Sequence, residues 1–125
     1  MENDKIQRLK SNCPYLTNLD LSYQNLDISK VKILSHFLKK NTYLTSLNLE
    51  GNDIDNEGST ILCNMLHKNS TLTELNLVNT KIKDSGARAL GKIVNKRNPP
   101  IHISLIKHFM ISGCYKETMY HIIKI

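Results

Sequence analysis

Apolar residues recur along this chain at intervals of 28 residues. The repeated positions are aliphatic in all three copies, and the copies align without gaps. They include Leu16, Leu44 and Leu72; Leu19, Leu47 and Leu75; Leu21, Leu49 and Leu77; Leu26, Ile54 and Ile82; Leu34, Leu62 and Leu90; and Leu38, Leu66 and Val94. Self-similarity at a fixed period indicates a repeat protein, in which each unit buries its apolar side against its neighbours.

The apolar period changes within each unit and so predicts the local structure. Residues 19–21, 47–49 and 75–77 alternate apolar and polar, which is typical of a short strand with one buried face. About ten residues later the spacing becomes three to four, which predicts one helical face. Its positions are Val31, Leu34 and Leu38; Ser59, Leu62 and Leu66; and Ala87, Leu90 and Val94.

The expected start of each helix carries residues typical of helix termini. We expect Asn56 and Asp84 to act as N-caps, because their side chains can accept hydrogen bonds from free N–H groups. Gly58 and Gly86 follow two residues later, where chain and helix must approach closely. Each unit is therefore expected to contain a strand, a turn, a helix and a loop.

The 125 residues are expected to form a single domain. Its parts are an N-terminal cap at 1–15, repeats at 16–43, 44–71 and 72–99, and a degenerate repeat with a C-terminal cap at 100–125. Ile6 and Leu9 predict a partial capping helix over residues 5–10, and Ile103 and Leu105 predict a fourth strand. The last stretch shows helical spacing again, which fits either a cap or the start of a truncated repeat; its apolar residues are Tyr115, Met119, Ile122 and Ile123.

The motif LxxLxLxxNxL followed by a helix resembles the ribonuclease-inhibitor class of leucine-rich repeats, which also occurs in NOD-like receptor sensor regions. Residues 16–98 carry this resemblance, and Leu44, Leu47, Leu49, Asn52 and Ile54 match the motif throughout. The resemblance implies an α/β fold: a right-handed solenoid with a parallel sheet on its concave face and helices on its convex face. It also implies that Asn52 satisfies backbone groups where the chain leaves the strand.

The residues between the strand leucines are expected to point outward and to form three ladders across the concave sheet. These are Asn18, Ser46, Glu74 and His102; Asp20, Asn48, Asn76 and Ser104; and Ser22, Glu50, Val78 and Ile106. All except Ile106 are our predicted partner-binding residues. The alternative is that these ladders are only the solvated covering of a sheet.

The net charge of +6 raises nucleic acid as a partner, but the basic residues fall outside these ladders. They fall in predicted helices and loops: Lys30, Lys32, Lys39, Lys40, Lys68, Arg88, Lys92, Lys96 and Arg97. The ladders instead carry Asp20, Glu50 and Glu74, so we predict a protein partner with a basic or amide-rich surface and no nucleic-acid partner. This chain itself would then act as an adaptor or as a microbial effector. The alternatives are a convex-face binder of nucleic acid or acidic membrane, and a self-assembling fragment that forms a homodimer through a terminal repeat.

Signals for catalysis, cofactors and metals are weak. Cys13, Cys63 and Cys114 are far apart, and neither they nor the five histidines have zinc-ligand spacing. Glu74 and His102 share a ladder, but a surface hydrogen bond explains that pair more simply than acid–base catalysis. We therefore expect no enzyme, no metal and no cofactor. No apolar run approaches the roughly 20 residues of a membrane span, and the N-terminus lacks a signal-peptide core. We therefore expect an intracellular, cytoplasmic protein. If the protein is a secreted effector, we expect it in the host cytoplasm.

Overall fold

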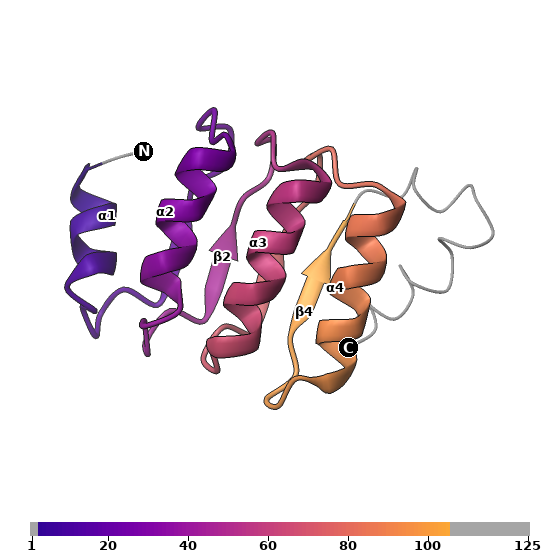
Figure 1. The fold of residues 1–125 in the computed structure, drawn as a ribbon. Helices are drawn as coiled ribbons and strands as arrows, with labels where there is room; N and C mark the ends of the chain where they lie inside the picture. Colours follow the sequence, from indigo (N-terminus) through magenta and orange to yellow (C-terminus); the bar gives the residue numbers. More distant parts are fainter. Residues whose placement is uncertain (1–2, 106–125) are drawn as a thin grey trace.

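The structure is a computed structural model that describes residues 3–105, and it consists of strand–helix units stacked in a row (Figure 1). The elements are α1 (Asn3–Lys10), β1 (Asn18–Asp20), α2 (Ile28–Leu38), β2 (Ser46–Asn48), α3 (Asp55–Lys68), β3 (Glu74–Asn76), α4 (Asp84–Lys96) and β4 (His102–Ser104). The alternation of strands and helices confirms the predicted α/β repeat fold.

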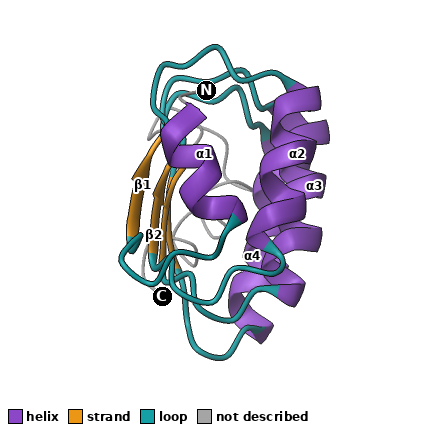
Figure 2. Ribbon diagram, turned by 90° about the vertical axis from the view of Figure 1, so that its left-hand side faces the viewer, coloured by secondary structure: helices purple, strands orange, loops and turns teal. Residues whose placement is uncertain are grey.

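The four strands form one parallel sheet in the order β1-β2-β3-β4. Leu19 is in register with Leu47, Leu47 with Leu75, and Leu75 with Ile103. Each step in the sheet is thus one sequence period, so the repeat length sets the register. Figure 2 shows the strands and helices α2–α4 as two separate layers.

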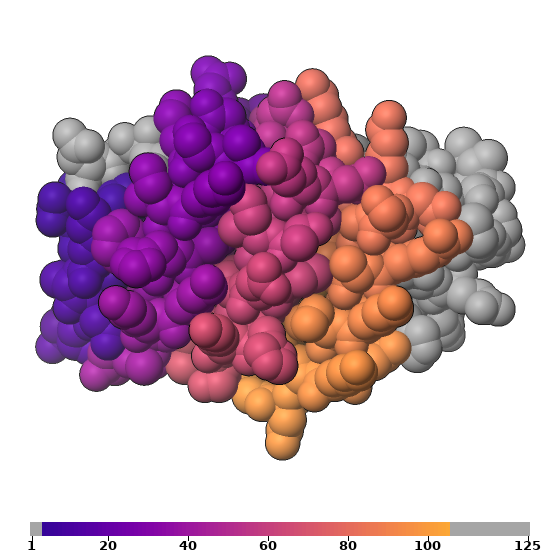
Figure 3. Space-filling model, viewed as in Figure 1, coloured from indigo at the N-terminus to yellow at the C-terminus, as the bar shows by residue number. Residues whose placement is uncertain are grey.

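The core lies between these two layers. The strand leucines are almost fully buried, as are the helix residues predicted from the period of three to four. Figure 3 shows the outer side of the helix layer, where successive repeats follow one another as adjacent bands. Because neighbouring units share one core, no repeat is expected to be stable alone.

The N-terminal cap and the fourth strand are confirmed. Helix α1 lies beside α2 at the start of the stack and across the end of the two layers (Figures 1 and 2). Ile6 and Leu9 point into the core, with 8% and 2% of their surface exposed. In and after β4, Ile103 and Leu105 are buried as predicted. The predicted C-terminal cap lies outside the described residues.

Asn52 joins the turns of two successive repeats. Its Oδ1 accepts hydrogen bonds from the backbone N–H groups of Gln24 and Leu26, at 3.1 and 3.0 Å. Its Nδ2 donates to the carbonyl oxygens of Leu21 and Leu49, each at 2.9 Å. Only 2% of Asn52 is exposed, so water does not replace these hydrogen bonds, and the backbone groups depend on the Asn52 side-chain amide. The role expected for Asn52 is confirmed.

The prediction that Asn56 and Asp84 cap the helices they precede is wrong. Helix α3 starts one residue before Asn56, and Asp84 is the first residue of α4. Asp55 closes the first turn of α3, since its Oδ1 accepts from the N–H groups of Glu57 and Gly58 at 2.9 and 3.1 Å.

Asn56 instead caps the next helix. Its Oδ1 accepts from the N–H groups of Lys83 and Gly86, at 2.9 and 3.1 Å, and both lie at the start of α4. Lys83 occupies the position that the capping aspartate holds one repeat earlier, and a lysine side chain has no acceptor. The cap of α4 therefore comes from the preceding repeat, while Asp84 pairs with Arg88 at 3.1 Å.

Candidate functional site

The exposed side of the sheet carries the predicted ladders. Strand pairing places Asn18 opposite Ser46, Ser46 opposite Glu74, and Glu74 opposite His102. The second ladder follows the same register, and the third lies just beyond the strand ends; Ile106 lies outside the described residues. We call this surface the strand face. It comprises Asn18, Asp20, Ser22, Ser46, Asn48, Glu50, Glu74, Asn76, Val78, His102 and Ser104. The structure thus brings together all eleven predicted residues, and their contact with a partner stays a prediction.

A shallow depression of about 470 Å³ lies on the strand face over β2, β3 and β4. Its polar lining comes from Ser46, Asn48, Glu74, Asn76, His102 and Ser104. Glu74 and His102 lie side by side within it and both are exposed. An open, polar depression suits a protein surface better than a small substrate, which is usually held in an enclosed and more apolar pocket.

The second ladder also has a structural role. The side-chain oxygen of each of its first three members accepts a hydrogen bond from the N–H group two residues later. The pairs are Asp20 with Ser22 at 2.9 Å, Asn48 with Glu50 at 3.0 Å, and Asn76 with Val78 at 3.0 Å. These side chains hold the turn after each strand, a local bond that Asp and Asn form readily.

A basic residue reaches the strand face from α1, which the strand pattern did not reveal. The Nζ of Lys5 donates to the carbonyl oxygen of Asp20 at 3.1 Å. Hydrogen bonds from Ser22 hold the pKa of the Asp20 carboxyl below its usual value, and the Lys5 charge adds to this effect. Lys5 thus offsets the charge on β1, and the acidic character of the strand face centres on Glu50 and Glu74.

Tyr23 also belongs to this surface, although the alternating strand pattern assigned it no role. Its hydroxyl donates to Glu50 Oε2 at 3.0 Å, while Asn76 Nδ2 donates to Glu50 Oε1 at the same distance. Tyr23 lies in the turn after β1, outside the alternating pattern that marked the ladders. A signal was present in the repeat, because the equivalent positions hold Gly51 and Asn79, residue types that turns favour.

The nine basic residues predicted to fall outside the ladders lie on the helix side of the molecule. They lie in or directly after helices α2, α3 and α4, and most are exposed. The members are Lys30, Lys32, Lys39, Lys40, Lys68, Arg88, Lys92, Lys96 and Arg97. The chain therefore presents two chemically different surfaces, one with carboxylates and amides and one with lysines.

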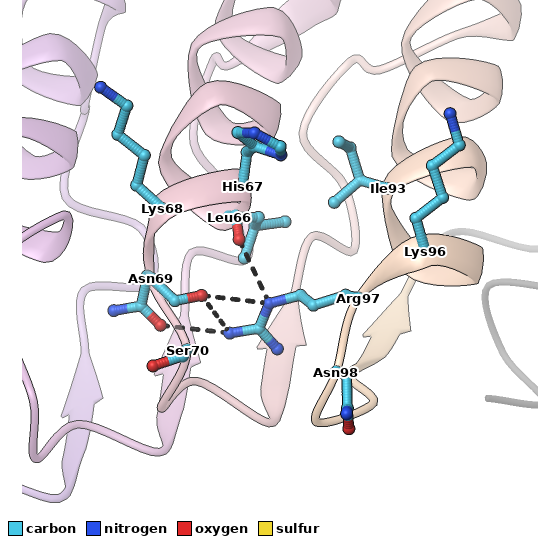
Figure 4. A pocket seen from close by; sticks show the side chains of 9 residues that line it. All are labelled: Leu66, His67, Lys68, Asn69, Ser70, Ile93, Lys96, Arg97 and Asn98. Carbon is cyan, nitrogen blue, oxygen red and sulfur yellow. Dashed lines mark hydrogen bonds between the residues drawn. The ribbon is translucent and has the colours of Figure 1, made fainter.

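A second hollow, of about 340 Å³, lies between the C-terminal ends of α3 and α4 (Figure 4). Four basic residues contribute to its lining: His67, Lys68, Lys96 and Arg97. Figure 4 shows the ammonium groups of Lys68 and Lys96 far apart at the two sides of the hollow, while Arg97 turns toward Asn69. The negative ends of two helix dipoles also meet here, which disfavours an anion.

Arg97 is committed to contacts within the protein. Its Nε donates to the carbonyl oxygens of Leu66 and Asn69 at 3.3 and 3.2 Å, and its Nη2 donates to Asn69 at 2.7 Å. Its Nη1 also donates to the carbonyl of Leu72. Burial lowers the pKa of this guanidinium. Because its donors satisfy carbonyls at the end of α3, we interpret Arg97 as a structural residue that closes this helix.

The two described cysteines lie in different environments. Cys13 is partly exposed, and a hydrogen bond from the backbone N–H of Tyr15, with a smaller contribution from Arg8, lowers the pKa of its thiol. Cys63 is buried in α3, and desolvation raises the pKa of its thiol to about 11. Cys114 lies outside the described residues.

We expect iodoacetamide at pH 8 to modify Cys13 at least about ten times faster than Cys63, since the thiolate is the reactive form and burial restricts access. Mass spectrometry of the digested protein after timed labelling separates the two sites. In urea-unfolded protein the rates should converge, which serves as the control. Equal rates in the folded protein would contradict the burial of Cys63.

Residues 3–105 contain no group of three or more His, Cys, Asp or Glu side chains that could hold a metal ion. In the same part of the chain, no helix combines the length and apolar character needed to cross a membrane.

Comparisons with known proteins point to one family. The model of the family described as Leucine Rich repeat matches residues 40–59 and 68–91. No curated protein matches the chain significantly. Among solved structures, leiomodin-1 actin-binding site 2 is similar with a TM-score of 0.79 and 20% identity, over 93% of this chain and 69% of that one. The tropomodulin C-terminal domain of Caenorhabditis elegans is similar with a TM-score of 0.61 and 9% identity, over 95% and 89%.

At these identities the structural likeness concerns the fold. It agrees with the stacked strand–helix units, the parallel sheet and the register of one period per strand. The family match falls on the second and third repeats, where the leucine pattern is most regular. Taken together, the internal repeat, the structure and the family match show a leucine-rich-repeat fold, with the Leucine Rich repeat model matched at residues 40–59 and 68–91.

Proposed function

We propose that this protein is an interaction module that binds another protein through its strand face and acts without catalysis. The observation that carries the proposal is the separation of charge between the two faces. Carboxylates, amides and hydroxyls lie in register on the sheet, while most of the described lysines lie in or directly after the helices and only Lys5 reaches the strand face. A nucleic-acid binder needs its positive charge on the docking surface, so the strand face favours a protein with basic or amide-rich groups.

A structural likeness suggests a partner, and two other features bear on the compartment and the repeat class. The similar leiomodin-1 structure is an actin-binding site, which makes actin the first partner to test. The two described cysteines are free thiols, which fits a reducing compartment such as the cytoplasm. The 28-residue period and the buried Asn52 support placement in the ribonuclease-inhibitor-like class of these repeats.

The test compares two variants with the same change in net charge. Ser46→Lys with Glu74→Lys alters the strand face at two side chains without intramolecular hydrogen bonds among the described residues. The matched control, Glu57→Lys with Asn64→Lys, makes the same charge change on exposed positions of α3. Both variants are first checked for native circular dichroism. Co-sedimentation with filamentous actin and affinity capture from cell lysate with mass spectrometry then measure binding.

We expect the strand-face variant to lose at least about tenfold in affinity for the captured protein, because like charges now face a basic partner. The helix-face control should bind as the native protein does. Loss only in the helix-face control, or salt-sensitive capture of RNA by all forms, would overturn the proposal in favour of the lysine-bearing face. A concentration-dependent dimer that survives both variants, without any partner, would favour self-assembly through a terminal repeat.

A further inference from the structure

Tyr23 adopts a backbone conformation that its side chain disfavours. Its φ is 54°, in the left-handed region, and the same turn position one and two repeats later is held by Gly51 at φ 72° and Asn79 at φ 56°. Glycine and asparagine enter this region at low cost, whereas a residue with a bulky side chain does not. The first repeat thus has a tyrosine at a turn position whose left-handed backbone conformation favours glycine or asparagine.

The Tyr23 ring is held in place by its surroundings. A Cβ built at Gly51 would lie 2.2 Å from Tyr23 Cε1, so the ring rests directly on the backbone of that glycine. At its far end, the hydroxyl is bonded to Glu50 Oε2. Glu50 is fixed in turn by the Nδ2 group of Asn76. The ring, the carboxylate and the amide therefore form a preorganised group in the turns after β1 and β2 and at the end of β3.

Tyr23 is nevertheless an exposed residue, with 61% of its surface accessible to solvent. One face lies on Gly51, so the remaining exposure leaves ring surface open to solvent. Burial in the core therefore does not explain a strained tyrosine here. Strained residues persist where the surrounding structure holds them, and they are frequent at ligand-binding surfaces. A rigid aromatic side chain also loses little conformational entropy when a ligand binds.

The chemistry of this group fits a cation. Each oxygen of Glu50 accepts one hydrogen bond and retains further acceptor capacity. No lysine or arginine within residues 3–105 forms an ion pair with Glu50. Val78 lies just beyond the end of β3, where its carbonyl oxygen accepts from the N–H of Gly51 at 3.1 Å. Its side chain offers apolar surface to the aliphatic part of an arginine side chain.

We propose that Tyr23 and Glu50 form a preformed acceptor for an arginine side chain of the partner protein, which rests on the proposed binding function of the strand face. The planar guanidinium stacks on the open surface of the Tyr23 ring and donates to the Glu50 carboxylate. Arginine suits this arrangement better than lysine, because its guanidinium is planar, weakly hydrated and able to donate several hydrogen bonds in one plane.

The direct test is an NMR titration of the full-length ¹⁵N-labelled protein with N-acetylarginine methylamide as probe. We expect saturable shifts of the Gly51 and Val78 amides at millimolar probe concentration. The matching lysine probe should bind at least about threefold more weakly, and the uncharged citrulline probe should cause no saturable shift. Equal responses to the arginine and citrulline probes, or no saturable response to arginine, would overturn the proposal.

Two variants tie the response to these side chains. Tyr23→Asn removes the ring with a residue that tolerates the left-handed turn, as Asn79 does, and is expected to weaken arginine binding about threefold. Glu50→Gln keeps one acceptor oxygen, replaces the other with an NH2 donor and removes the charge, and is expected to weaken arginine binding about tenfold. Tyr43→Asn, at an exposed tyrosine elsewhere, is the control and should bind as the native protein does.

Stability and partner capture separate this proposal from simpler explanations. Tyr23→Asn should leave the midpoint of urea unfolding unchanged or raise it, whereas a structural tyrosine would lower it. If the captured protein is lost with Ser46→Lys and Glu74→Lys but retained by Tyr23→Asn and Glu50→Gln, the strand face binds and the arginine acceptor is wrong. If all these variants retain it, the strand-face function itself fails.

Discussion

Replacement of Asn52 by leucine is expected to lower the free energy of unfolding by about 3–4 kcal/mol, a large part of the stability of a domain this size. Leucine is similar in size, so packing changes little, but the amide is lost. The N–H groups of Gln24 and Leu26 and the carbonyls of Leu21 and Leu49 then lose a partner in a region with almost no exposure. Unpaired buried polar groups are costly because no water replaces the lost bond.

Urea unfolding followed by circular dichroism measures this effect. The control is Asp53→Ala at the neighbouring residue, whose carboxylate lies 3.5 Å from Lys81 Nζ with both side chains mostly exposed. Exposed ion pairs contribute little, so this variant should lose less than about 1 kcal/mol. A similar small loss for Asn52→Leu would show that water or rearranged backbone replaces the amide.

Replacement of Gly86 by alanine is expected to destabilise the protein by about 2–3 kcal/mol, although alanine is normally the better helix residue. A Cβ at this position would stand 2.6 Å from Ser59 Oγ, 2.7 Å from Asn56 Oδ1 and 2.8 Å from Ile82 Cγ2. The first two atoms belong to α3, so the added methyl group separates the helices. It also displaces the Asn56 oxygen that caps α4.

The same unfolding measurement tests this prediction, with the exposed neighbour Ser85→Ala as control, expected within about 0.5 kcal/mol of the native protein. Asn56→Ala alone should cost about 1–2 kcal/mol through the lost cap. In the double variant the two losses should not add, because removal of the Asn56 oxygen makes room for the new methyl group. Strict additivity would argue against contact between these two residues.

The sequence predicted most of the framework because each feature depends on spacing along the chain. The buried positions of Leu47 and Leu75 and the helical face at Leu62 and Leu66 follow from periods of 2, 3.6 and 28. The role of Asn52 was implied by the resemblance to leucine-rich repeats. The strand register was implicit in the same period, because identical units stack in identical register. The composition of the strand face therefore came directly from the positions between the leucines.

The errors and omissions involve contacts between successive repeats. Asn56 looks like the N-cap of α3, but Asp55 already accepts the hydrogen bonds at the start of that helix. Lys83 has no side-chain acceptor for the start of α4, so Asn56 caps α4 instead. Lys5 lies far from Asp20 in the chain and reaches it only because α1 covers the end of the stack. Tyr23 appears as an ordinary turn residue until its φ and its contact with Gly51 are known.

The sequence by itself determined the repeat length, the α/β class, the core and the separation of acidic and basic faces, because all of these follow from the order of side chains within one unit. The tertiary structure alone decided which side chains meet across units: Asn56 with the start of α4, Arg97 with the end of α3, and Tyr23 with Glu50. The physical reason is that these bonds depend on distances of a few ångströms between separate turns, and periodicity fixes the register of the units without fixing the reach of each side chain.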